Sequence, residues 1–116
     1  MAVLLDVDAL PDGFAYPRQF IRVVELGLID LEPWHILEGE HLWRRDRGLK
    51  TRYPARVLVP FAERQDMDEV ACWEPFAGDE VVIIHDYASP GWERRRTFAT
   101  FYDWFRQAVE DLIEFD

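Results

Sequence analysis

The chain has 116 residues, 23 of them acidic and 13 basic, and its formal net charge at neutral pH is −10. This length fits one domain with one core, and 49% of the residues are apolar. The acidity disfavours a nucleic-acid partner, because phosphate binding needs a basic surface. No run of about 20 apolar residues is present, so no membrane contact is predicted.

The cysteine content and the N-terminal segment bear on the compartment. Cys72 is the single cysteine, so no internal disulfide is expected, and a free thiol suits a reducing compartment. Residues 1–13 lack a basic residue, and acids interrupt their apolar run, which argues against a signal peptide. We therefore expect a single cytoplasmic domain over residues 1–116.

Charges occur in blocks along the chain. Residues 44–64 hold seven bases and two acids, and residues 65–93 hold eight acids and no base. The run Arg94-Arg95-Arg96 follows directly. Two interpretations of the net acidity stay open: it keeps the protein in solution, or it forms an acidic face aimed at a basic partner. The blocks themselves can also be interleaved by the fold.

The first half of the chain contains two predicted helices. The first spans residues 17–26, led by Pro17 and stopped by Gly27. Residues 28–37 contain a proline that prevents a continuous helix, so an extended stretch and a single helical turn both remain open. A second helix or a helical turn is predicted for residues 39–52, where an internal glycine weakens the pattern.

Three short strands are predicted next, at residues 57–61, 70–73 and 81–85. Pro60 cannot donate a ladder hydrogen bond, which indicates a strand end or an edge strand. The unbroken apolar run of the third strand predicts burial on both of its faces. Since the loops between the strands have hairpin length, the strands should form an antiparallel meander.

The last helix is the clearest element of the chain. Apolar residues recur at three- and four-residue spacing from Phe98 to Ile113. Thr97 or Thr100 can cap this helix, and Asp103 completes a capping-box pattern with Thr100. The order of elements predicts an α+β fold, a small antiparallel sheet with a meander of at least three strands and helices packed to one side of it.

Catalytic and metal-binding patterns are poorly represented. The three histidines, His35, His41 and His85, share no recognisable ligand spacing. Ser89 does not lie in a nucleophile elbow, and Cys72 lies inside a predicted strand, where an inert thiol is the default. We therefore expect no enzymatic activity, no metal and no cofactor.

One enzymatic alternative remains open, a small hydrolase or ligand-binding domain. It would use His85 with Asp86 and an acid of the Asp79-Glu80 turn. A general base must lie within hydrogen-bond reach of its partner, so this alternative requires those groups to converge.

Five tryptophans are more than the core of so small a domain is expected to hold. A core position is expected for Trp34 and Trp73. It is not expected for Trp92, which lies in a predicted turn beside three arginines, or for Trp104, which lies off the apolar stripe. Tryptophan and arginine are enriched at binding hot spots, so these positions favour macromolecular recognition.

Several segments together carry a family pattern. They are Tyr16-Pro17 with Phe20 and Leu26-Gly27, Leu58 to Ala62, Val70 to Glu74, Val81 to His85, and Phe98 to Phe105. The pattern resembles the SUKH superfamily, the Smi/Knr-type domain of fungal cell-wall-synthesis regulators and of many bacterial immunity proteins. This chain departs from it in the charged turn at residues 63–68, where the family has a glycine-rich turn, and in its shorter length. The resemblance implies an α+β domain that works by protein–protein binding, and it allows an immunity role against a toxin.

The expected binding surface lies at one end of the sheet. In a three-strand meander, the 62–69 loop and the 86–95 segment lie at the same end. Trp92 would supply buried apolar area, and the charges would steer a protein partner such as a toxin with a basic surface. In the alternative, Trp92 covers the sheet edge and the arginines pair with the acidic loop. The predicted partner-binding residues are Trp92, Asp66, Asp68, Glu69, Arg94, Arg95 and Arg96.

Overall fold

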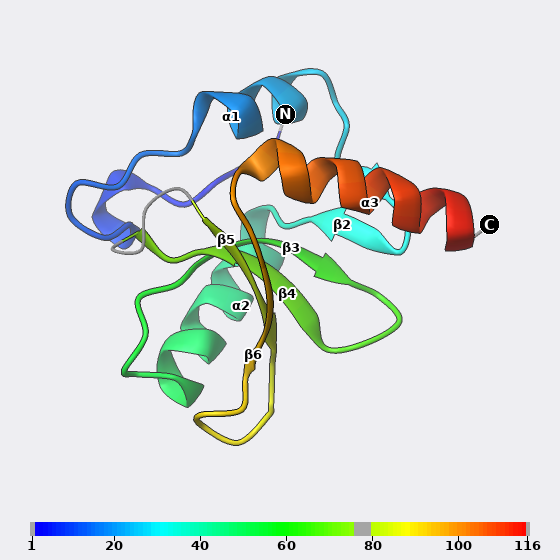
Figure 1. Ribbon diagram of the computed structural model, residues 1–116. Helices are drawn as coiled ribbons and strands as arrows, with labels where there is room; N and C mark the ends of the chain where they lie inside the picture. Colours follow the sequence, from blue (N-terminus) through cyan, green and yellow to red (C-terminus); the bar gives the residue numbers. More distant parts are fainter. Residues whose placement is uncertain (1, 76–79, 116) are drawn as a thin grey trace.

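A computed structural model describes residues 2–75 and 80–115 (Figure 1). Its strands form one antiparallel sheet in which each strand pairs with the next along the chain. The predicted α+β class and antiparallel meander are therefore confirmed. The strands are β1 (Asp30–Leu31), β2 (Trp34–Ile36), β3 (Val59–Arg64), β4 (Glu69–Trp73), β5 (Val81–His85) and β6 (Arg94–Phe98). The helices are α1 (Arg18–Glu25), α2 (Gly39–Arg52) and α3 (Phe101–Phe115), and a short 3-10 helix, η1, spans Val7–Ala9.

Helices cover both faces of the sheet, with α1 and α3 on one face and α2 on the other (Figure 1). Along β5, Val81 and Ile83 pack in the core under α1 and α3, while Val82 and Ile84 pack in the core under α2. The predicted burial of β5 on both faces is confirmed. The expectation that the helices lie to one side is wrong, because both faces of the central strands are apolar and each needs a cover.

The first helix and the segment after it follow the local sequence signals. Pro17 is the residue just before α1, and Gly27 ends the helix in a left-handed conformation with φ of 76°. Residues 28–37 are extended and form the β1–β2 hairpin, which turns at the cis peptide bond between Glu32 and Pro33. The predicted helix at 39–52 matches α2.

β3 is an interior strand, so the edge interpretation of Pro60 is wrong. Pro60 is the second residue of β3, which agrees with the strand-end interpretation. β2 pairs with β3 only at residues 62–64 of β3. The register between β3 and β4 shifts just after Pro60. A proline without an N–H is tolerated there because no β2 residue is its partner.

The buried face of α3 differs from the predicted one. Thr100 caps the helix, since the Asp103 N–H donates to Thr100 Oγ1 at 3.2 Å. Trp104 is only 1% exposed, and its ring centroid lies 4.9 Å from that of Phe61 and 5.4 Å from that of Trp34. The surface position expected for Trp104 is therefore wrong, whereas the core positions of Trp34 and Trp73 are confirmed.

Within the described residues, no helix has the length and apolar character that a membrane crossing requires.

Candidate functional site

Two turns meet at one end of the sheet. The Asp86 N–H, which follows β5, donates to the Asp68 carbonyl in the β3–β4 turn at 2.7 Å. Residues 65–69 and 86–93 therefore lie side by side, as the meander geometry predicted. We call the exposed residues of these two segments the turn-end surface.

Trp92 is the most exposed aromatic residue of the turn-end surface, with 77% of its surface accessible. Its backbone is nevertheless held in place, because the Trp92 N–H donates to the Ser89 carbonyl at 2.9 Å. The neighbouring Gly91 N–H donates to the Glu93 carboxylate at 2.6 Å. The sheet edge is thus not covered by the Trp92 ring, and an indole is presented to solvent from a hydrogen-bonded turn.

Tyr87 adds a second aromatic group to the turn-end surface, and sequence reasoning missed it. It is 64% exposed, and its φ of 69° lies in the left-handed region, which is costly for a bulky residue. The Tyr87 N–H donates to Asp86 Oδ1 at 2.9 Å, and the Arg52 guanidinium lies 4.1 Å from the ring centroid. The hydrogen bond holds the Tyr87 backbone and the Arg52 contact holds its ring, and no sequence pattern around Tyr87 indicates either contact.

The three predicted acids have different environments. Asp66 accepts two hydrogen bonds of 2.9 Å from Arg64, and this guanidinium lowers the pKa of Asp66. Glu69 is half-buried at the start of β4, opposite His85. Asp68 is exposed and forms no ion pair within the described residues. Glu69 forms no ion pair among the described residues either, but it is half-buried, so Asp68 is the more exposed of the two uncompensated acids on the turn-end surface.

The predicted arginine patch forms most of an edge strand that the sequence did not indicate. Arg94, Arg95 and Arg96 belong to β6 and are all exposed. Among residues 2–75 and 80–115 none of them has a carboxylate within ion-pair distance. The alternative in which these arginines pair with the acidic loop is thus not what the structure shows. They extend away from the turn-end surface along the sheet edge.

Beneath the turn-end surface lies a buried ion network centred on Asp86, whose side chain is 0% exposed. Arg45 Nη1 donates to Asp86 Oδ2 at 2.7 Å, and Arg52 donates to both carboxylate oxygens at 2.6 Å. Arg45 also pairs with Glu63, whose second oxygen lies 2.6 Å from His41 Nε2. Helix α2 is thereby tied to β3 and to the first residue of the 86–93 turn.

The electrostatics of this network favour the ionised carboxylate. Burial alone would raise the pKa of Asp86, but the hydrogen bonds from Arg52 and Arg45 outweigh it and lower that pKa. Gly48 helps to leave room, because a Cβ there would lie 2.5 Å from Arg52 Nη2. The glycine that weakens α2 thus accommodates the side chain that reaches Asp86.

Most bases of the 44–64 block are neutralised within the fold. Within the described residues, six of its seven bases each pair with a carboxylate that lies on α2, on β3 or in a segment between strands. They are Arg44, Arg45, Lys50, Arg52, Arg56 and Arg64. The interleaving interpretation of the charge blocks therefore describes this part of the chain, and uncompensated acids dominate what remains on the surface.

Of the groups named for the hydrolase alternative, His85 and Glu80 do not converge. His85 ends β5 and Glu80 precedes it, so they lie roughly 16 Å apart along the strand. Asp79 falls outside the described residues. The Asp86 carboxylate is buried and bonded to two arginines, which leaves it no free oxygen to orient a base. Cys72 is buried, which raises the pKa of its thiol, and no group of three metal-ligating side chains occurs among the described residues.

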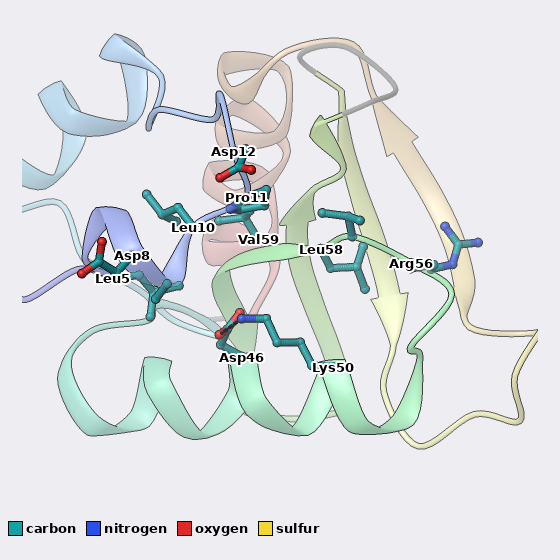
Figure 2. A pocket seen from close by; sticks show the side chains of 12 residues that line it. Leu5, Asp8, Leu10, Pro11, Asp12, Asp46, Lys50, Arg56, Leu58 and Val59 are labelled. Atoms are coloured by element: carbon teal, nitrogen blue, oxygen red, sulfur yellow. Dashed lines mark hydrogen bonds and ion pairs between the residues drawn. The ribbon is translucent and has the colours of Figure 1, made fainter.

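Figure 2 shows a pocket of about 470 Å³ where the N-terminal segment crosses α2 and the start of β3. Leu10 and Leu58 contribute apolar walls. The buried Asp46 already pairs with Lys50 at 2.8 Å. Arg56 pairs with Glu74 and Glu93 outside the pocket. The lining also includes Asp8 and Asp12, which form no ion pair within the described residues, so the pocket combines apolar surface with two free carboxylates.

No family model, curated protein or solved structure matches this chain. The resemblance of the sequence to the SUKH superfamily accordingly stays a prediction.

Proposed function

We propose that the chain is a non-catalytic protein-binding domain that contacts its partner through the turn-end surface. The observation that carries this proposal is Trp92, which is 77% exposed on a turn fixed by its own hydrogen bonds. A large indole on a rigid backbone can bury much apolar area at a small cost in conformational entropy, which is the signature of a binding hot spot.

The charges support a partner of opposite sign. The chain carries a net charge of −10, and most bases of its basic block are paired internally. A partner that approaches Asp68 therefore meets a negative field, which speeds the association of a basic surface. The resemblance to the SUKH superfamily supports an immunity role, in which this basic partner is a toxin that the domain occludes.

Capture followed by reconstitution tests the proposal. The immobilised chain is used as bait in native lysate at low salt, and candidates encoded beside its gene are purified and titrated. We expect a one-to-one complex that weakens as salt rises, because the steering charges are screened. Backbone hydrogen exchange should slow at residues 65–69 and 86–93 on binding, while α1 serves as the internal control. Absence of any stoichiometric partner, or protection confined to other surfaces, would contradict the proposal.

A further inference from the structure

β6 forms an open edge of the sheet. It pairs with β5 on one side, and no strand of the described chain pairs with its other side. β6 has five residues, whereas β1, the strand at the opposite edge of the sheet, has two. The outward N–H and C=O groups of an edge strand form a template on which another strand can add.

The side chains of β6 give this edge a run of three consecutive positive charges. Arg94, Arg95 and Arg96 are exposed, and none has an ion-pair partner within residues 2–75 and 80–115. The Arg96 guanidinium lies 4.9 Å from the ring centroid of Phe98, which holds it along the strand. A run of three uncompensated cations in a chain of net charge −10 calls for an acidic counterpart.

We propose that β6 binds an acidic, extended segment of a protein partner, which adds to the sheet as a seventh antiparallel or parallel strand. The register shift in β6 makes Arg94 and Arg96 the partners of Ile84 and Ile83, so the two arginines lie on opposite faces of the sheet. Main-chain hydrogen bonds would supply the affinity, and carboxylates on both faces of the added strand would select the sequence. A second copy of this chain fits poorly, because two β6 edges in contact would place arginine runs against each other. This surface is additional to the proposed turn-end surface, which can bind a partner without it.

The alternative role for these arginines is protection, since charges on an edge strand also discourage aggregation. Binding of a designed peptide separates the two roles. The probe is a capped seven-residue peptide of glutamate with valine and threonine, with glutamates on both faces of the extended strand. Its controls are the same peptide with lysine in place of glutamate, and an acidic peptide with a central proline that interrupts the ladder.

We expect the acidic peptide to bind at low salt and both control peptides to bind at least tenfold more weakly. The double variant Arg94→Glu/Arg96→Glu should lose at least tenfold in affinity. The matched variant Arg18→Glu/Arg22→Glu, which makes the same charge change on exposed positions of α1, should keep it. Backbone hydrogen exchange in β6 should slow when the acidic peptide binds.

Several results would overturn the proposal. Equal affinity of the acidic peptide for both double variants would show that binding depends only on the net charge of the protein. Equal affinity of the proline peptide and the acidic peptide for the wild type would exclude strand addition. Dimerisation through β6, or tighter binding of single-stranded DNA than of the acidic peptide, would identify another occupant. Failure here leaves the turn-end proposal intact if the captured partner still protects residues 86–93, so the two can fail separately.

Discussion

Replacing Asp86 with alanine is expected to lower the free energy of unfolding by about 3–5 kcal/mol, the usual cost of removing one partner from a buried ion pair. The substitution leaves Arg45 and Arg52 facing a site that is 0% exposed without their shared carboxylate. It also removes the acceptor of the Tyr87 N–H. Urea unfolding at pH 7 measures the loss.

Asp68→Ala is the matched control, because Asp68 is exposed and its carboxylate forms no ion pair among the described residues. Its effect should stay within about 0.5 kcal/mol. A loss of less than about 1 kcal/mol for Asp86→Ala would show that the network contributes little net stability.

The same pair of proteins should differ less at acidic pH. The pKa of Asp86 is lower in the folded chain than in the unfolded chain, since Arg52 and Arg45 outweigh the effect of burial. Its contribution to stability is therefore complete above the unfolded pKa, about 4, and is lost as the pH falls through the folded pKa. The stability gap between the wild type and Asp86→Ala should be largest at pH 7 and should shrink toward pH 3.

Trp104→Ala is expected to lower the free energy of unfolding by about 3–5 kcal/mol. The indole is 1% exposed and lies in edge contact with the rings of Phe61 and Trp34. Removing it leaves a cavity between α3 and the sheet that the stiff neighbouring rings fill only in part. Chemical denaturation monitored by circular dichroism measures the change without relying on tryptophan fluorescence.

Trp43→Ala gives the comparison for this second variant. Trp43 is 49% exposed on α2 and contacts the guanidinium of Arg47 at 4.4 Å from the ring centroid. Its loss should cost about 0.5 kcal/mol, as is usual on a surface. Equal effects of the two substitutions would mean that Trp104 does not pack as described.

Much of the fold could be predicted because local signals were strong. The unbroken apolar run of β5 predicted that strand at the observed bounds, and the weaker pattern at residues 39–52 also matched the bounds of α2. β6 was not predicted because three successive exposed arginines show no alternation of apolar and polar residues. Its strand conformation comes from its pairing with β5. Trp104 was misplaced because Ala108, which shares its buried face, carries almost no hydrophobic signal.

The candidate site was predictable in position but not in chemistry. Meander geometry alone placed the two turns together, and the hydrogen bond between Asp86 and Asp68 confirms it. The spacing of Arg45 and Arg52, seven residues apart on one helix, marks a common face. The contact of this face with Asp86 joins residues far apart in the sequence, so no local pattern predicts it.

The most direct test of the binding proposal compares two exposed tryptophans with the same partner. Trp92→Ala should raise the Kd for the captured partner by about 30-fold or more, corresponding to a hot-spot loss of about 2 kcal/mol, and should shift the melting temperature by only a few degrees. Trp43→Ala, on the outer surface of α2, should leave the Kd within about twofold of the wild type. An unchanged Kd for folded Trp92→Ala, or a melting temperature lowered by more than about 10 °C, would contradict the turn-end surface as the site of binding.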